Sequence, residues 1–165
     1  MAKIPKSRLK TLYQTSEIAE IWNSSQNQAV IEHPEHGCIS PNKYREMYKG
    51  KPCPYCGQKM VHDQKFYSTS SQKKAIQLGY EYIDKWGKKT INQVGGRFFH
   101  PNYVTLDHKL NKARFPEKMF DYSNLEIICW RCNHDKGDDN TCNLKHNIEY
   151  LQSLASETLK RYPTL

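Results

Sequence analysis

Apolar residues in the first 50 positions recur at the spacing of short helices. The stretch 17–22 carries such a stripe directly after Ser16, which fits a helix cap. Ser40 and Pro41 are typical of a helix start, and Gly50 is typical of the residue just past a helix end. We therefore predict two short helices in this part of the chain and expect both to serve packing.

A polar insertion with one longer helix is predicted in the middle of the chain. Residues 62–74 are rich in Ser, Gln and Lys, which is typical of a loop. Ser71 fits a helix cap and Gly87 a helix stop, so we predict a helix that runs through Trp86. Its lysines are interpreted as a solvated face, with DNA contact as the minor alternative.

The last third of the chain predicts two strands and two helices. Aromatic and β-branched residues indicate strands, and apolar residues three and four positions apart indicate helices. The expected elements are strands at 103–108 and 125–128, a short helix at 131–138 and a longer helix at 143–161. The predicted fold class is α+β, a small antiparallel hairpin and helix with further helices around it.

Length and composition narrow the class of protein. The chain has 165 residues, which predicts a single domain: a helical extension at 1–50, a core at 51–139 and a final helix at 140–165. It carries neither an apolar run of about 20 residues nor a signal peptide, so we expect a cytoplasmic protein with no membrane partner. The net charge of +8 favours a polyanionic partner without identifying it.

Four of the six cysteines form two Cys-x-x-Cys pairs, Cys53 with Cys56 and Cys129 with Cys132. Thiolates bind zinc in tetrahedral sets of four, and a two-residue spacer lets both sulfurs of a pair reach one ion. The alternative is a redox pair, because Cys-Pro-Tyr-Cys is similar to the glutaredoxin active-site motif. We favour structural zinc, since it explains four cysteines rather than two. The remaining two, Cys38 and Cys142, are interpreted as ordinary thiols.

A second set of residues surrounds the second cysteine pair. The sequence reads Leu-Asp-His at 106–108, Asn-Leu at 124–125 and Cys-Asn-His-Asp-Lys-Gly-Asp at 132–138. In this order the chain resembles the HNH endonucleases, a branch of the ββα-metal (His-Me finger) nucleases. The motif covers about residues 104–138, together with the first cysteine pair. The resemblance implies a ββα-metal core held together by the zinc site.

The resemblance also implies a role for each motif residue. His108 would be the general base, Asp107 and Asn133 would bind a catalytic Mg²⁺ or Mn²⁺, and Asn124 would brace the loop that holds the histidine. His134 is the alternative metal ligand, because an alignment shift of one residue would exchange it with Asn133. A histidine base and an ion with oxygen ligands suit phosphodiester hydrolysis on general grounds as well.

Contacts with DNA are expected from basic residues near the motif. Lys136 is the main candidate for a phosphate contact, with Arg131 and Arg114 as weaker candidates. The chain departs from many family members at Asn111, where they have proline, and in the Gly-free stretch 112–122. We therefore do not carry over to this chain the base or phosphate contacts that this loop makes in the family.

The predicted function is a metal-dependent endonuclease that cuts DNA and leaves 5′-phosphate and 3′-hydroxyl ends, as the family does. The alternative is a zinc-knuckle module that binds nucleic acid without catalysis. The spacing of Asp107, His108 and Asn133 favours the nuclease, since a binding module has no need of it.

Overall fold

The computed structural model describes residues 4–12, 14–137, 152–153, 155–156 and 159–160. Most of the predicted helix at 143–161, and Cys142, lie outside this part of the chain. Helices and antiparallel strands are mixed, as the predicted α+β class requires. In the described part of the chain, no helix is long and apolar enough to cross a membrane.

The N-terminal region consists of helices α1 (Lys6–Leu9), α2 (Thr15–Ser24) and α3 (Pro41–Met47) and a hairpin. Both predicted helices are present. In α3, the Ser40 hydroxyl accepts from the Lys43 N–H and Pro41 takes the first turn, as expected. The expected cap at Ser16 is wrong, since Ser16 lies inside α2 and the cap position is held by Gln14, two residues earlier.

The hairpin between α2 and α3 was not predicted. Its strands are β1 (Ile31–His33) and β2 (Gly37–Ile39), joined by a turn at 34–36, and Gly37 directly after the turn has a φ of +67°. Only Ile31, His33 and Ile39 among its residues are buried, which is too few to form a clear alternating pattern.

The insertion contains small strands and two short helices rather than one long helix. Ser71 caps α5 (Gln72–Gln77) as predicted, but Gly79, with a φ of +78°, ends the helix early. Beyond it, the buried Tyr82 pairs with Thr90 and donates its hydroxyl to Asn92 over 2.8 Å. The predicted helix through Trp86 is therefore wrong from residue 78 onward. The other elements are α4 (Gln64–Tyr67), β3 (Ser68–Thr69), β4 (Tyr82–Ile83), β5 (Lys89–Thr90), β6 (Asn92–Val94) and β7 (Arg97–Phe99).

The two predicted strands of the core are confirmed as β8 (Val104–His108) and β9 (Leu125–Cys129). They pair antiparallel, with Val104 opposite Cys129 and His108 opposite Leu125. Helix α6 (Trp130–Lys136) follows and packs on both strands. Short 3₁₀ turns η1 (Pro116–Lys118) and η2 (Tyr122–Asn124) lie in the loop between the strands.

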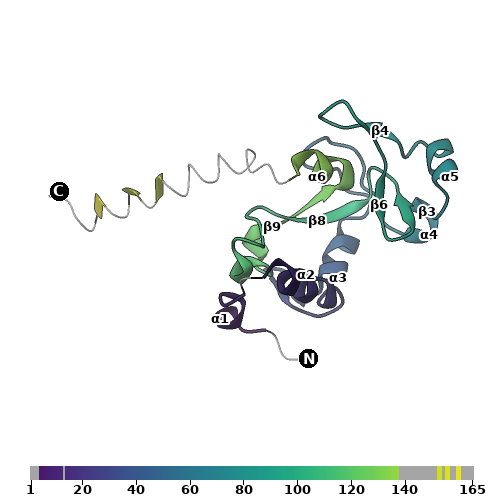
Figure 1. Ribbon diagram of the computed structural model, residues 1–165. Coiled ribbons are helices and arrows are strands. Elements are labelled where there is room, and N and C mark those ends of the chain that lie inside the picture. The colour runs from purple at the N-terminus through teal and green to yellow at the C-terminus, as the bar shows by residue number, and fades with distance from the viewer. Residues whose placement is uncertain (1–3, 13, 138–151, 154, 157–158, 161–165) are drawn as a thin grey trace.

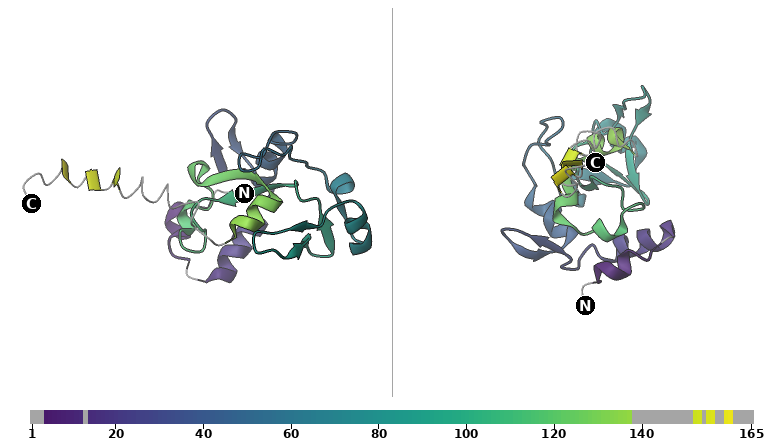
Figure 2. Two further views of the ribbon diagram at one scale, coloured as in Figure 1. Left: turned by 90° about the horizontal axis from the view of Figure 1, so that it is seen from above. Right: turned by 90° about the vertical axis from the view of Figure 1, so that its left-hand side faces the viewer.

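The strand pair is enclosed on several sides (Figure 1, Figure 2). Helix α6 covers one side, α2 and α3 lie on the opposite side, and the insertion extends beyond the start of β8. Alternation places Val104, Leu106 and Ile127 in a buried apolar cluster that also includes Ile31 and Tyr44 of the N-terminal region. The N-terminal elements thus contribute directly to the core that holds β8 and β9.

Candidate metal centre and nuclease site

The four paired cysteines meet in one cluster, although Cys129 follows Cys56 by 73 positions. Their sulfur atoms all lie within 4.8 Å of one another. The Sγ atoms of Cys56 and Cys129 are 3.7 Å apart, and thiolates on a tetrahedral zinc would lie about 3.8 Å apart. Cys53 and Cys56 stand in a tight turn, Cys129 ends β9 and Cys132 lies in the first turn of α6. The cluster therefore fits a four-cysteine zinc site.

Electrostatics in the cluster also favour a bound cation. Burial raises the pKa of Cys129 to about 12, and burial and the neighbouring thiol of Cys129 raise the pKa of Cys132. Burial opposes ionisation of Cys53 too, but backbone N–H groups of Cys129, Cys56 and Tyr55 outweigh it and lower its pKa. Crowded thiols of this kind ionise together when a metal ion shares their charge. A zinc ion would supply that charge and hold the turn, β9 and α6 together.

His108 is the last residue of β8 and is held by the loop that follows. Its Nε2 lies 2.9 Å from the Met119 carbonyl oxygen. Because a carbonyl only accepts, Nε2 carries the proton and Nδ1 is left as the basic nitrogen. Burial, reinforced by the nearby Lys112, lowers the pKa of His108 to about 4. The ring is therefore neutral at pH 7, with Nδ1 unprotonated.

Asp107 points to the opposite face of β8, toward α6. There it forms an ion pair with Lys136, whose ammonium group also lies 3.2 Å from Glu126 Oε1. Burial raises the pKa of Asp107 in spite of the opposing hydrogen bond from Lys136. Burial alone would lower the pKa of Lys136, but its bonds with Asp107 and Glu126 raise it. Asp107 and Glu126 are directly opposed across the strand pair, so Lys136 separates two carboxylates.

Asn133 and His134 project to different sides of α6. Asn133 Nδ2 donates to Thr105 Oγ1 over 3.0 Å, next to Asp107 on the same face of β8. His134 instead has its Nε2 3.3 Å from Asp84 Oδ2 in the insertion. Of these two alternatives, only Asn133 lies on the side of the helix that faces Asp107.

Asn124 is buried and spans the loop between β8 and β9. Its Oδ1 accepts from the Leu110 N–H at 2.7 Å, and its Nδ2 lies 3.2 Å from the Leu110 oxygen and 3.1 Å from the Lys118 oxygen. The side chain thus ties both ends of this loop together. The same loop carries Met119, which contacts His108.

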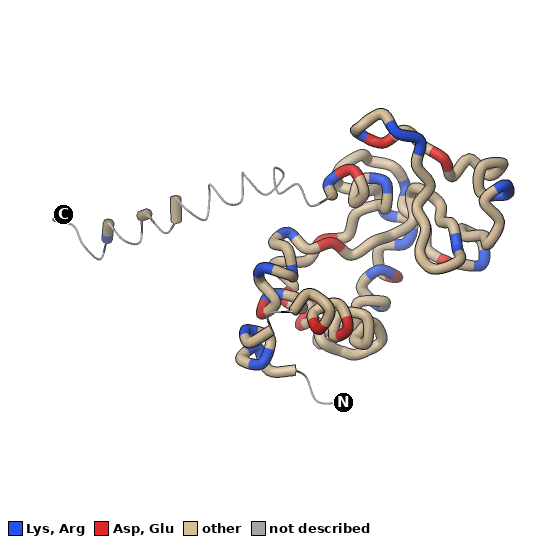
Figure 3. The backbone as a smooth tube through the Cα atoms, viewed as in Figure 1, with Lys and Arg blue, Asp and Glu red and all other residues tan. Residues whose placement is uncertain are grey.

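The three basic candidates for DNA contact are placed very differently. Lys136 is buried and forms ion pairs within the protein, so its ammonium group is not exposed for a direct phosphate contact. Arg131 is exposed, with its guanidinium 5.4 Å from the centre of the Tyr82 ring. Arg114 is exposed in the loop after β8. Other basic residues are spread over α1, this loop and the insertion (Figure 3).

Two groups beside these residues were missed by the sequence reasoning. Glu126 binds Lys136 and also accepts a 2.7 Å hydrogen bond from the Tyr55 hydroxyl, which links the cysteine turn to the site. Trp22 packs edge to face on His108, with ring centroids 4.6 Å apart. Only the register of β8 against β9 could have revealed Glu126, since it lies 19 positions from Asp107. No local signal marked Trp22, which lies in a helix expected only to pack.

The site combines a ββα unit, a four-cysteine cluster, and adjacent Asp107 and His108 at the end of the first strand. Residues 93–139 match the family model described as HNH endonuclease. The matched segment includes β8, β9, α6 and the second cysteine pair, so this part of the chain is similar to the HNH endonuclease domain. Comparisons with curated proteins and with solved structures gave no match.

Proposed function

We propose that this protein is a metal-dependent endonuclease that hydrolyses DNA phosphodiester bonds with His108 as the general base. The observation that carries the proposal is the 2.9 Å contact between His108 Nε2 and the Met119 carbonyl oxygen, which favours the tautomer with the proton on Nε2. This leaves Nδ1 to take a proton from the attacking water. The domain is proposed to span the whole chain, with residues 1–50 as an extension around the core. Location in the cytoplasm stays a prediction.

Asp107 and Asn133 are proposed to hold the catalytic ion. Their oxygens suit a hard cation, and both residues lie on the α6 side of β8. Mg²⁺ or Mn²⁺ bound there would neutralise charge on the phosphoryl and leaving oxygens. Glu126 contributes by holding Lys136 beside Asp107, where the hydrogen bond from Lys136 opposes the burial that raises the pKa of Asp107. Arg131 and Arg114 are exposed and can contact phosphates, whereas Lys136 acts first as the partner of Asp107.

The test is plasmid cleavage by purified protein with Mg²⁺, with Mn²⁺ and with EDTA. Wild type should cut only with a divalent ion. His108→Ala should lose about 10²- to 10⁴-fold in rate, the usual contribution of a general base, with unchanged zinc content. His36→Ala is the matched control, because its side chain is 51% exposed on the β1–β2 hairpin. DNA binding without cleavage under every metal would instead support the non-catalytic zinc-knuckle module.

A further inference from the structure

A cavity of about 440 Å³ lies beside β8, between the N-terminal helices and the insertion. It touches Val104, Thr105 and Leu106, three successive residues whose side chains alternate between the two faces of the strand. It therefore follows the edge of β8 that does not pair with β9. The start of this edge is already paired, because the Val104 N–H donates to the Val61 oxygen at 2.9 Å. The other walls come from α2, α3, α4, β6, β7 and the start of α6.

The cavity adjoins both halves of the proposed nuclease site. Trp22 lines it and also packs on His108, with the two ring centroids 4.6 Å apart. Thr105 lines it too, and its hydroxyl accepts the 3.0 Å hydrogen bond from Asn133. A molecule in this cavity would therefore lie next to the proposed base and the helix that carries a proposed metal ligand.

Arg45 gives the cavity its charge. One guanidinium nitrogen, Nη1, donates to Gln26 Oε1 at 2.7 Å and to Asn42 Oδ1 at 2.8 Å, and both acceptors are neutral amides. Within the described part of the chain no carboxylate forms a salt bridge with Arg45, and none lines the cavity. Burial lowers the pKa of Arg45 to about 10, against the opposing effect of Tyr103. A charge desolvated in this way is stabilised by an anion.

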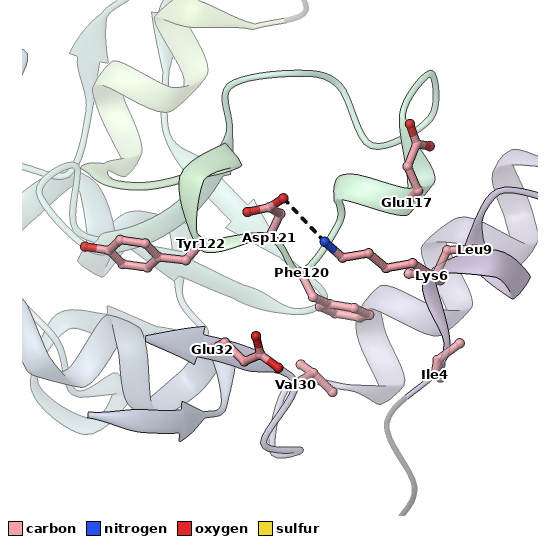
Figure 4. Close-up of a pocket in the computed structure, with 9 residues that line it drawn as sticks. All are labelled: Ile4, Lys6, Leu9, Val30, Glu32, Glu117, Phe120, Asp121 and Tyr122. Atoms are coloured by element: carbon pink, nitrogen blue, oxygen red, sulfur yellow. Dashed lines mark ion pairs between the residues drawn. The ribbon is translucent and has the colours of Figure 1, made fainter. Parts of the chain in front are cut away.

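Another cavity, lined by α1 and the residues around Asp121, provides a contrast (Figure 4). It measures about 120 Å³ and is lined by three carboxylates, those of Glu32, Glu117 and Asp121. Its one lysine, Lys6, lies 3.7 Å from Asp121. This cavity is too small and too acidic for a phosphate ester. Of these two cavities, the one beside β8 is therefore the better candidate for binding an anion.

The remaining walls suit a nucleobase. Trp22 and Trp130 provide aromatic surface, and Trp130 packs against Phe99 in a tilted arrangement with ring centroids 4.9 Å apart. Amide side chains such as Asn23 and Gln64 can bond to the polar edges of a base. Aromatic surface together with a cation is the usual composition of sites for unpaired nucleotides. The volume falls within the range of about 300–1,000 Å³ of sites that hold small ligands.

We propose that this cavity binds one unpaired nucleotide of the DNA strand that is cut, with Arg45 on its phosphate and the two tryptophans against its base. The inference rests on the proposed nuclease function and deepens it. A base stacked in a duplex cannot enter a cavity, and unpaired bases leave the stack at the lowest cost. The enzyme should therefore cut beside a bulge, mismatch or single-stranded stretch in preference to fully paired DNA.

The binding test uses a fluorescent thymidylate oligonucleotide in EDTA, so that no cleavage occurs. Arg45→Gln should weaken binding about tenfold, as expected for the loss of a charge-assisted contact. Lys43→Gln removes the same charge from the same helix but outside the cavity, where Lys43 pairs with the exposed Glu46. It should change affinity no more than about twofold. Equal affinity of wild type and Arg45→Gln would overturn the inference.

A second variant, Val94→Glu, keeps the inference testable if Arg45→Gln fails to fold. Val94 lines the cavity but is 61% exposed, so a carboxylate there repels a phosphate without disturbing the core. It too should weaken oligonucleotide binding, at an unchanged melting temperature. Unchanged binding by a folded Val94→Glu protein would count against the site.

A cleavage assay distinguishes failure of the nucleotide-binding inference from failure of the proposed nuclease function. A fully paired duplex and the same duplex with a central bulge are compared with Mg²⁺, and faster cleavage beside the bulge is expected. Equal rates on both, with binding insensitive to Arg45, overturn the inference and leave the nuclease standing. Arg45-dependent binding without cleavage of either duplex overturns the nuclease and leaves a nucleotide-binding cavity.

Discussion

Replacement of Asn124 by alanine tests how the loop between β8 and β9 is held in place. The side chain is 4% exposed and makes three hydrogen bonds, to Leu110 N, Leu110 O and Lys118 O. A net contribution of about 1 kcal/mol for each gives a loss of about 3 kcal/mol in the free energy of unfolding. This is a large fraction of the stability of a small domain, commonly about 5–15 kcal/mol.

The same change should reach the proposed base through Met119. The Met119 carbonyl lies in the loop that Asn124 ties together, and it fixes His108 by the 2.9 Å contact with Nε2. When the loop is released, His108 can rotate and exchange tautomers, so Nδ1 is no longer held as the acceptor. We expect cleavage to fall well before the protein unfolds, while zinc content stays normal.

Urea denaturation followed by tryptophan fluorescence measures the stability change, and plasmid cleavage measures activity. Ser123→Ala is the matched control in the next position: it removes one exposed 2.8 Å bond to Asp121 and should cost less than about 1 kcal/mol. An Asn124→Ala protein as stable as Ser123→Ala would refute the bracing role. Full activity in a destabilised Asn124→Ala protein would refute the coupling to His108.

Three further outcomes are expected. Replacement of any one of the four clustered cysteines by serine should abolish zinc binding, measured by elemental analysis, and unfold the domain. Cys38→Ser should have a mild effect, because Cys38 is exposed and lies outside the cluster. Lys136→Met should cost about 3 kcal/mol at pH 7 by leaving Asp107 and Glu126 unpaired. Burial already raises the pKa of Asp107, and loss of the Lys136 ammonium raises it further. The loss of stability should therefore grow as the pH rises above about 4, the pKa of aspartate in the unfolded chain, and shrink in acid. Urea titrations at several pH values check this dependence. Asp107→Ala should lose cleavage even at high Mg²⁺ in a plasmid assay; retained activity would exclude Asp107 as a ligand of the ion.

Local patterns determined the parts of this protein that depend on neighbouring residues. The two-residue spacer of each cysteine pair, the aromatic and β-branched residues that predicted β8 and β9, and the Ser40–Pro41 helix start were all readable, because each reflects a few consecutive residues. The same locality explains the error after Gln77. The predicted helix relied on Gly87 as its stop, but Gly79 ended it earlier and Tyr82 pairs with Thr90 in a hairpin.

Tertiary structure alone decided what the site residues touch. The register of β8 against β9 sets Glu126 opposite Asp107, and a shift of one residue would turn either side chain to the other face. Packing of α6 on the strands then buries Lys136 between them, although the sequence suggested a surface lysine. The cavity at Arg45 likewise depends on α3 lying beside β8, about 60 positions away along the chain. Such contacts are set by how the whole core packs, and no local spacing encodes them.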